Sequence, residues 1–409
     1  MRSLVLLPKC PVPADNGSRQ RLVELTDALH ERGGVDILIS QPITVDERDA
    51  VLARFPGARV SALATPLSPA PKARSRWLTA RDVPLGVALL DPHDARREAR
   101  SFASGSRPDV VFAAGAMVRW LFGPAVPPAP VVIDFADITS VLHRREHDVI
   151  RRAGLPHSLS TAKDLVRHRV DAARWDRFER AQAATASLVT VCSVADRDAL
   201  AQPGAVVVPN GARRPATPAA ARRSSEPPAT LLFPGQMTYG PNVDGAIWFV
   251  GEVLPRLRAL VPDVQIEIVG RASAAVEALA STEGVEVRGY VERMDDALEA
   301  ATAVIVPLRQ GSGTRIKIIE AWANHLPVVS TTVGAEGLGI LDGVDALLAD
   351  DAAAFATACA RVLDDAALRR RLVENGAARY DDEFDWRAIR AGFGARVDAF
   401  VAGNIRAER

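Results

Sequence analysis

Short runs of aliphatic and β-branched residues recur along the chain and alternate with longer segments whose apolar positions follow a helical spacing. Runs of this length and composition predict buried strands of a parallel sheet. The segment after the first run carries Leu22, Leu25 and Leu29 and stops at Gly33-Gly34, so it predicts a helix. The chain therefore opens with a strand–helix–strand unit, for which a right-handed crossover is expected. The predicted strands of the first half are 3–7, 35–39, 109–112, 131–135, 188–192 and 205–208.

The same alternation restarts after a break in the middle of the chain. Residues 213–230 are rich in Pro, Ala, Arg and Ser without periodicity, which is typical of an exposed linker. Before the break, residues 140–186 have a helical pattern and are heavily charged. The second half has predicted strands at 231–233, 264–269, 285–287, 303–306 and 327–331, and predicted helices at 242–261, 292–300, 314–324, 352–379 and 386–402.

The length of the chain and this alternation predict the domain organisation. A chain of 409 residues is too long for one ordinary core. We expect an α/β protein with two Rossmann-like, doubly wound domains that face each other across a cleft. Because ligands of such sheets bind at the carboxyl ends of the strands, the site is expected in that cleft. The predicted parts are an N-terminal domain (1–212), a linker (213–230), a C-terminal domain (231–385) and a terminal helix (386–409) that packs back on the N-terminal domain.

Composition narrows the class of protein. The formal net charge is zero, so no global electrostatic attraction favours nucleic acid as a partner. Cys10, Cys192 and Cys359 are odd in number and far apart, which predicts reduced, buried thiols in a cytoplasmic protein rather than a metal site or disulfides. The apolar run before Pro8 is too short for a signal peptide, and no apolar stretch approaches the ~20 residues that span a bilayer. We therefore expect a soluble cytoplasmic protein.

The strongest chemical signal is the turn between strand 303–306 and the helix that follows it. A glycine-rich turn at a helix start lets backbone N–H groups face a phosphate. First helical turns usually carry acidic residues, yet this one carries Arg315 and Lys317, which suggests an anion between them and the helix end. The chain has four lysines against 46 arginines, so a lysine here stands against a strong compositional bias. Two solvated surface cations remain the alternative.

Two further groups of candidates lie at strand ends in the first half. Gly17 lies in the turn after the first strand, where it could let backbone N–H groups approach a phosphate, but Asn16 could equally be an ordinary helix N-cap. Asp134 and Asp137 lie at the end of strand 131–135. One of them could orient or deprotonate an acceptor hydroxyl, or they could cap the following helix.

The charged helical region offers two weaker hypotheses. His143 and His147 are spaced to share a helix face, but without a third ligand they do not predict a metal site. The stretch 143–180 holds ten Lys or Arg against six Asp or Glu. It could contact anionic lipid head groups at the inner face of a membrane, although a solvated helical face is the simpler interpretation.

Several motifs of the second half follow one another in order and at sensible spacing. They are VVVPNGA (206–212), PGQMTYGPNVDGAIWFVGEVLPRL (234–257), VQIEIVGR (264–271), VEVRGYVERMDDAL (285–298) and GSGTRIKIIEAWANHLPVVSTTVGAEGL (311–338). Together they resemble the nucleotide-sugar-binding domain of glycosyltransferase family 4, whose members are retaining enzymes of the GT-B fold. The first half resembles the family more loosely, through PVPADNGSRQRLVELTDAL (11–29) and VVIDFADITS (131–140). Within the family, the chain most resembles bacterial transferases of surface or exopolysaccharide assembly.

The resemblance implies roles for individual residues. Glu320 takes the place of the second glutamate of an E-x7-E motif and would accept hydrogen bonds from the ribose, whereas Ser312 replaces the first glutamate. The cations that many relatives carry after the strand at 231–233 are absent from Gly235-Gln236-Met237, which leaves the diphosphate to Arg315 and Lys317. The implied catalytic residues are Arg315, Lys317 and Asp137. The implied donor-binding residues are Gly17, Gly235, Arg271, Tyr290, Val291, Ser312, Gly313, Thr314 and Glu320, and the acceptor-side candidates are Asn16, Arg19 and Asp134.

The implied function is transfer of a sugar from a nucleoside diphosphate to an acceptor hydroxyl of a glycan, a lipid-linked glycan or a small molecule. The donor would bind mainly to the second domain and the acceptor to the first, and no essential metal or cofactor is expected. Two alternatives stay open. A catalytically silent nucleotide-sugar-binding subunit would explain the missing first glutamate, and a nucleotide-sugar epimerase would use the same fold. The donor sugar, the base and the acceptor are not readable from the sequence.

Overall fold

The computed structural model describes residues 1–14, 16–67, 82–152, 159–215, 229–291, 294–311 and 314–407. Contacts within the chain divide it into two compact units. Unit 1 comprises Met1–Asn210 and Ile389–Arg409, and unit 2 comprises Gly211–Ala388. Most of the predicted linker, residues 216–228, lies outside the described residues.

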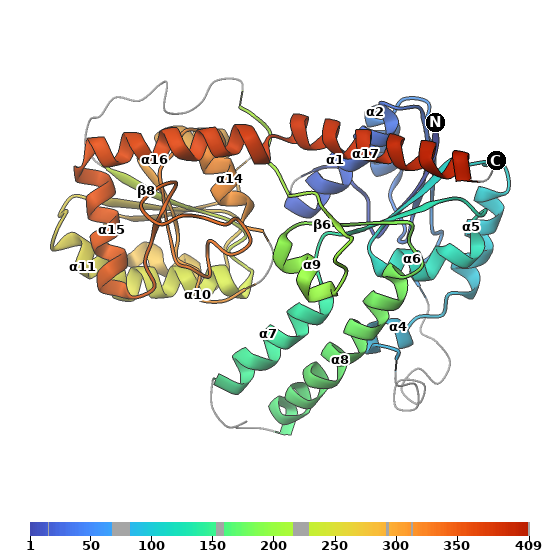
Figure 1. Cartoon of the computed structure of the whole chain (residues 1–409). Coiled ribbons are helices and arrows are strands. Elements are labelled where there is room, and N and C mark those ends of the chain that lie inside the picture. Colours follow the sequence, from blue (N-terminus) through green and yellow to red (C-terminus); the bar gives the residue numbers. More distant parts are fainter. Residues whose placement is uncertain are drawn as a thin grey trace. The chain divides into compact units, whose positions relative to one another are not determined.

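Unit 1 is built on a parallel sheet with the strand order β3-β2-β1-β4-β5-β6-β7 (Figure 1). The aliphatic side chains of its central strands are fully buried because helices pack on the sheet. The strands are β1 (Arg2–Leu7), β2 (Gly34–Ile39), β3 (Arg59–Ala62), β4 (Val110–Ala114), β5 (Val131–Phe135), β6 (Leu188–Val191) and β7 (Val206–Val207).

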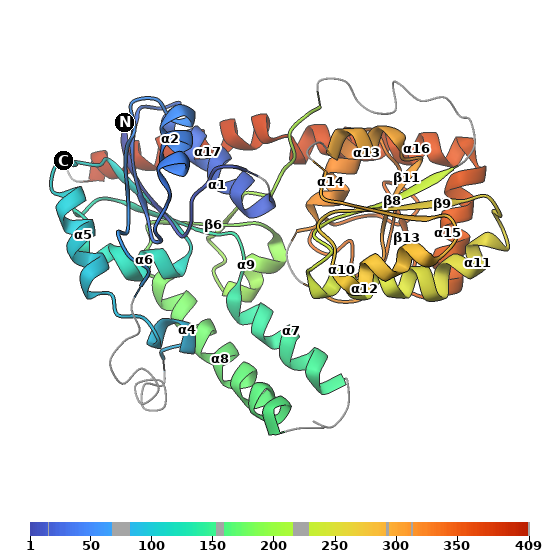
Figure 2. The same ribbon diagram turned by 180° about the vertical axis from the view of Figure 1, so that it is seen from behind.

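Two long helices of unit 1, α7 and α8, form a hairpin that extends away from the sheet and lie side by side in both views (Figures 1 and 2). The last helix, α17, begins in unit 2, and from Ile389 onward it belongs to unit 1. There the Phe393 ring meets Phe112 of β4 edge to face. The helices of this unit are α1 (Gly17–His30), α2 (Val45–Arg54), α4 (Leu85–Ala88), α5 (His93–Ala103), α6 (Ala116–Phe122), α7 (Thr139–Arg152), α8 (Leu159–Ala183), α9 (Val194–Leu200) and α17 (Trp386–Ala407).

Unit 2 repeats this architecture with the strand order β10-β9-β8-β11-β12-β13, also parallel. Its strands are β8 (Thr230–Pro234), β9 (Gln265–Val269), β10 (Val285–Gly289), β11 (Ala303–Val306), β12 (Val328–Ser330) and β13 (Leu347–Leu348). Its helices are α10 (Gly240–Trp248), α11 (Leu254–Arg258), α12 (Ala274–Glu277), α13 (Met294–Ala300), α14 (Ile316–Ala323), α15 (Ala352–Asp364) and α16 (Ala366–Arg379).

The structure confirms the predicted fold class of two Rossmann-like, parallel-sheet domains, and it corrects details of the elements. The predicted helix 242–261 is interrupted by a π-helical turn at Phe249–Val253, and the predicted helix 352–379 is two helices. The cysteines are buried and free, as predicted. Among the described residues, no helix combines the length and the apolar character that crossing a membrane requires.

Candidate active site

The candidate active site of unit 2 lies at the carboxyl edge of its sheet. The strand order reverses between β8 and β11, and in open parallel sheets this switch point is where ligands bind. The chain leaves β8 at Gly235, and it leaves β11 toward the glycine-rich turn that precedes α14. The two segments that flank the switch point therefore carry the strongest candidates from the sequence.

Arg315 occupies the position before the first turn of α14, where it is the N-cap residue with φ −85° and ψ 78°. Its side chain is buried, at 6% exposure. Because Arg315 still belongs to the loop, it does not diverge from Lys317 as two residues of a regular helix would. A Cβ on Gly311 would lie 3.1 Å from Nη2 of Arg315, so a residue without a side chain makes room for the guanidinium.

Lys317 lies in the first turn of α14 and points toward the end of β8. Its Nζ donates a hydrogen bond to Oδ1 of Asn242 at 2.9 Å and lies 4.6 Å from the ring centroid of Phe233, a cation–π distance. The Asn242 amide is oriented by its other end, since Nδ2 donates to the Gln236 carbonyl at 2.9 Å. These contacts hold the ammonium group in one place, and no carboxylate of the described residues lies at hydrogen-bond distance from it.

Gly235 is required by the position of Lys317. A Cβ on this glycine would lie 2.9 Å from Nζ of Lys317 and 3.0 Å from Nδ2 of Asn242. Its φ of +150° is also a conformation that side chains rarely adopt. The neighbouring turn after β9 packs just as closely, because a Cβ on Gly270 would clash with the Gly235 carbonyl oxygen. This close approach brings the exposed Arg271 to the same edge of the sheet.

The electrostatics of α14 are those of a prepared anion site. Burial among protein atoms lowers the pKa of Lys317 to about 7, and the neighbouring Arg315 cation lowers it further while Glu320 opposes the change. Burial likewise raises the pKa of Glu320 to about 7, against the attraction of Lys317. No acidic residue lies in the first turn of the helix. An ammonium group held here against desolvation, a second cation and the helix dipole would be stabilised by a bound anion.

We expect Lys317→Met to change stability in a pH-dependent way. The folded pKa of Lys317, about 7, lies below that of an unfolded lysine near 10.5, so the charge destabilises the fold fully below pH 7 and not at all above about 10.5. The difference in thermal unfolding midpoint, Lys317→Met minus wild type, should therefore be most positive near pH 6. This difference should decrease as the pH rises toward 10. A difference independent of pH would contradict the lowered pKa.

The other donor-site candidates of unit 2 surround this edge. Thr314 is partly exposed just before Arg315. Tyr290 follows β10, with 66% of its surface exposed, while Val291 is partly buried and packs on the core of the unit. Ser312 and Gly313 lie outside the described residues.

In unit 1, the turn after β1 has the geometry of a helix cap. The Asn16 side chain accepts a hydrogen bond from the Arg19 backbone N–H at 3.0 Å, so the alternative of an N-cap is confirmed for Asn16. Gly17 is the first residue of α1 and is partly exposed. The turn lies at the switch point of this sheet, between β1 and β4, where a helix N-terminus can still face an anion.

Asp134 differs from its predicted roles. Its carboxylate is buried and accepts two hydrogen bonds from Arg21, at 2.8 Å from Nε and 2.6 Å from Nη2. The Thr190 hydroxyl donates to the same group at 2.6 Å. Because this ion pair engages both carboxylate oxygens, Asp134 neither caps a helix nor is placed to receive a proton from an acceptor. We therefore do not propose it as an acceptor-side residue.

Asp137 has surroundings that suit a base. It is an exposed residue of the loop between β5 and α7. The surrounding protein raises the pKa of Asp137, and the Asp196 carboxylate raises it further, while Arg21 lowers it. A carboxylate with a raised pKa at a strand end can accept a proton more readily than an ordinary aspartate.

Two residues that shape these sites were not singled out in the sequence. Asn242 lies 75 positions from the lysine that it binds. One sign of its importance is present in the sequence. Asn242 is a polar residue next to Pro241 at the start of a helix, and this segment resembles the family. Arg21 gave no signal in the sequence, because a charged residue on a helix is usually exposed. The structure shows it buried, with further hydrogen bonds to the carbonyl of Val208 and the side chain of Asn210.

Comparisons with known proteins agree with this geometry. Residues 228–365 match the family model described as "Glycosyl transferases group 1". Over 135 residues the chain is 29% identical to an uncharacterized 44.6 kDa protein in the cps region of Klebsiella pneumoniae, a match that covers 31% of this chain and 35% of that protein. Over 219 residues it is 28% identical to glycogen synthase of Mycobacterium tuberculosis, a match that covers 50% of this chain and 51% of that protein. The chain thus spans about a third to a half of the length of these curated relatives.

A solved structure has a similar fold over nearly the whole length of this chain. The crystal structure of Anabaena HepE in complex with UDP and glucose superposes with a TM-score of 0.61 at 16% identity, covering 97% of this chain and 99% of that one. With its two parallel Rossmann-like units, the chain has the GT-B fold. Within this fold, the glycosyl transferase group 1 match extends from β8 to α15 of unit 2.

Proposed function

We propose that this protein is a retaining glycosyltransferase that moves a sugar from a nucleoside diphosphate to an acceptor hydroxyl, as members of glycosyltransferase family 4 do. The observation that carries the proposal is the pair of cations at the start of α14. Arg315 is held at the N-cap and Lys317 in the first turn, where their own helix disfavours them. A diphosphate at this edge would resolve that conflict.

In the proposed reaction, the bond between the anomeric carbon and the diphosphate oxygen breaks, and the acceptor oxygen bonds to that carbon on the same face of the sugar. The acceptor proton passes to an oxygen of the leaving diphosphate. Negative charge grows on the diphosphate as the bond breaks, so the fixed charges of Arg315 and Lys317 stabilise the transition state more than the ground state. Because protein cations perform this task, the proposal needs no metal ion for transfer.

Other residues of unit 2 would hold the remaining parts of the donor. Glu320 lies three residues after Lys317 on α14 and would accept hydrogen bonds from the ribose. The Gly235 turn, Arg271 and Thr314 would line the diphosphate, together with Ser312 and Gly313. The backbone at Tyr290 and Val291 would contact the base. HepE in complex with UDP makes uridine a natural first test for the base.

Unit 1 would supply the acceptor side. We propose Asp137 as the group that orients the acceptor hydroxyl, and the Asn16–Arg19 turn, with Gly17, as a contact for the donor phosphate or the acceptor. The resemblance of the sequence motifs to bacterial transferases of surface or exopolysaccharide assembly supports an acceptor of that kind. A soluble cytoplasmic enzyme that touches the inner face of the membrane through α7 and α8 would suit a lipid-linked acceptor.

A thermal-shift screen tests the donor site. The chain is heated with UDP, GDP, ADP and their common sugar conjugates, alongside Lys317→Ala. A ligand that binds only the folded state raises the unfolding midpoint, by an amount that grows with the logarithm of its concentration relative to its Kd. We expect selective stabilisation by one nucleotide and its loss in the variant. No shift at millimolar concentration with any of them would contradict a donor site.

The pKa values of α14 predict a narrow pH optimum. In the free enzyme, kcat/KM for the donor should fall above about pH 7 as Lys317 loses its proton, and below about pH 7 as Glu320 gains one. In Lys317→Arg the alkaline limb should disappear, because arginine keeps its charge across this range. Initial rates at subsaturating donor between about pH 5.5 and 9 measure the profile, and a flat profile in the wild type would contradict it.

A further inference from the structure

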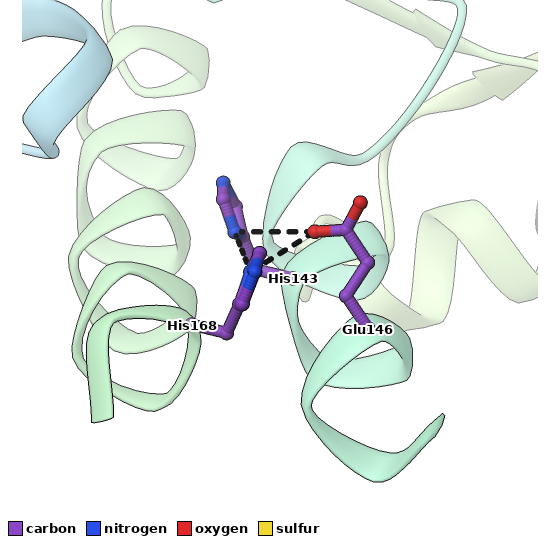
Figure 3. Close-up of side chains that lie close together, drawn as sticks. All are labelled: His143, Glu146 and His168. Carbon is purple, nitrogen blue, oxygen red and sulfur yellow. Dashed lines mark hydrogen bonds and ion pairs between the residues drawn. The ribbon is translucent and has the colours of Figure 1, made fainter. Parts of the chain in front are cut away.

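The α7–α8 hairpin carries a cluster of side chains that the transfer reaction does not use. His143 and Glu146 lie on α7, and His168 on α8 faces them (Figure 3). Figure 3 shows both imidazole rings and the carboxylate turned toward a common point between the helices. The sequence pattern had paired His143 with His147 along one helix, whereas the structure pairs it with His168, 25 positions away.

The distances within the cluster fit a metal ion. Nδ1 of His143 and Nδ1 of His168 are 3.0 Å apart, and Oε2 of Glu146 is 3.0 Å from the latter and 3.7 Å from the former. A triangle with these sides has a circumscribed radius of about 1.9 Å, so a point exists about 2.1 Å from all three atoms. Bonds of about 2.0–2.2 Å are those of Zn²⁺ to imidazole nitrogen and carboxylate oxygen.

Hydrogen bonding alone leaves this arrangement poorly satisfied. A neutral imidazole donates from only one of its nitrogens, so a hydrogen bond between the two Nδ1 atoms requires one ring to carry its proton on Nδ1 and the other on Nε2. If the Nδ1 proton sits on His168, the same N–H is shared between His143 and Glu146. If both rings were charged, two N–H groups would face each other at 3.0 Å. A cation at the common point would instead engage a lone pair of all three ligand atoms.

The rest of the hairpin supports a fixed site. At the base of the hairpin, Glu179 of α8 accepts the backbone N–H groups of Thr139 and Ser140, the first residues of α7. Further out, Arg144 and Asp176 form an ion pair at 3.7 Å. His143 immediately precedes Arg144 on α7, and His168 lies further out than Asp176 on α8. Both histidines are largely shielded, with 20% and 12% of their side chains exposed, while Glu146 is 45% exposed.

We propose that His143, Glu146 and His168 bind a divalent transition-metal ion of the Zn²⁺ type, which clamps α7 to α8. Two imidazoles and one carboxylate suit Zn²⁺, Co²⁺ or Ni²⁺ better than Mg²⁺ or Ca²⁺, which prefer oxygen ligands alone. The three protein ligands leave at least one position for water. The ion has a structural task and stands apart from the donor residues, none of which lies on α7 or α8.

One neighbouring group must adjust when the ion binds. Nη2 of Arg167 lies 3.4 Å from Nε2 of His168, which carries the proton once Nδ1 holds a metal. Arg167 already has a carboxylate partner, Asp164, at 3.1 Å. The guanidinium therefore has an alternative contact on its own helix.

Titration of the full chain, freed of metal with a chelator and dialysed, tests the site. Zn²⁺ is followed by calorimetry and Co²⁺ by the visible absorption of its complexes. We expect one ion per chain, with affinity reduced at least tenfold in His168→Ala and in Glu146→Gln. His147→Ala is the matched control, because His147 lies one residue from Glu146 and has its own neighbour, Asp148, at 3.4 Å. It should bind as wild type does.

The variants separate the possible outcomes. If His147→Ala abolishes binding while His168→Ala retains it, the site is the pair along one helix and the proposal is wrong. Equal affinity in all variants, or no saturable binding at about 100 μM Zn²⁺, also overturns it. Because the exposed Glu146→Gln change leaves the helices intact, loss of binding there cannot be attributed to unfolding. Circular dichroism of each metal-free variant confirms this.

Discussion

Replacing Lys317 with alanine should lower turnover at least tenfold while the protein stays folded. The ammonium group is positioned by Asn242 and Phe233 at the switch point of the unit 2 sheet, where the leaving diphosphate would gain charge. Removing one preorganised electrostatic group of this kind costs about 10²–10³-fold in kcat in other enzymes. Steady-state rates at saturating donor measure the loss, and circular dichroism checks the fold.

The matched control for this experiment is Arg361→Ala. Arg361 is an exposed cation on α15 of the same unit, so its removal changes the net charge equally without touching the switch point. We expect its kcat to stay within about twofold of wild type, as exposed charges contribute little. Unchanged activity in Lys317→Ala would remove this lysine from the mechanism.

Replacing Glu320 with glutamine should raise the donor KM about ten- to a hundredfold. A hydrogen bond to a charged group is worth about 1.5–3 kcal/mol, which corresponds to this range for a carboxylate that holds the ribose. The change also removes the negative charge that raises the pKa of Lys317, so the alkaline limb of kcat/KM should move to lower pH. Initial-rate kinetics over donor concentration and pH measure both effects.

The two effects distinguish the roles of Glu320. A shift of the alkaline limb without a change in KM would mean that Glu320 acts only through Lys317. Glu374→Gln, an exposed position on α16, is the control and should change neither quantity. If Glu320→Gln behaves like this control, the resemblance to the second glutamate of the E-x7-E motif does not carry the ribose contact.

The strands were the part of the fold that the sequence predicted best. Parallel strands covered on both faces form continuous apolar runs, and those at 131–135 and 303–306 agree with β5 and β11 to the residue. The missed strands lie at sheet edges. β3 has the mixed sequence RVSA and β13 is only two residues long, so neither shows an uninterrupted apolar run.

The chemistry of the donor edge was predictable for a local reason. Cations are unusual in the first turn of a helix, and this anomaly can be recognised from about a dozen consecutive residues. Arg315 and Lys317 could therefore be singled out without knowledge of the fold. The groups that position them could not. Asn242 and Gly235 reach Lys317 only because β8 and β11 are neighbours in the sheet, an arrangement that no local pattern contains.

On the acceptor side, the roles of the candidate residues could not be predicted from local sequence. Asp134 lies at a strand end, as a functional carboxylate often does, but its role depends on which helix residue points at it. Arg21 lies on α1, 113 positions earlier, and a charged residue on a helix gives no sign that it is buried. The histidine cluster depends in the same way on the pairing of α7 with α8.

The measurement that tests the central claim most directly is a transfer assay with the donor chosen by the thermal-shift screen. Release of the nucleoside diphosphate and formation of the glycosylated product are followed across a panel of glycan, lipid-linked and small-molecule acceptors, with Lys317→Ala beside the wild type. We predict equal amounts of both products, a retained anomeric configuration and at least a tenfold loss in the variant. Donor binding with neither transfer nor hydrolysis across the panel would contradict the account and favour a silent nucleotide-sugar-binding subunit. Epimerisation of the donor without an acceptor would favour the epimerase alternative.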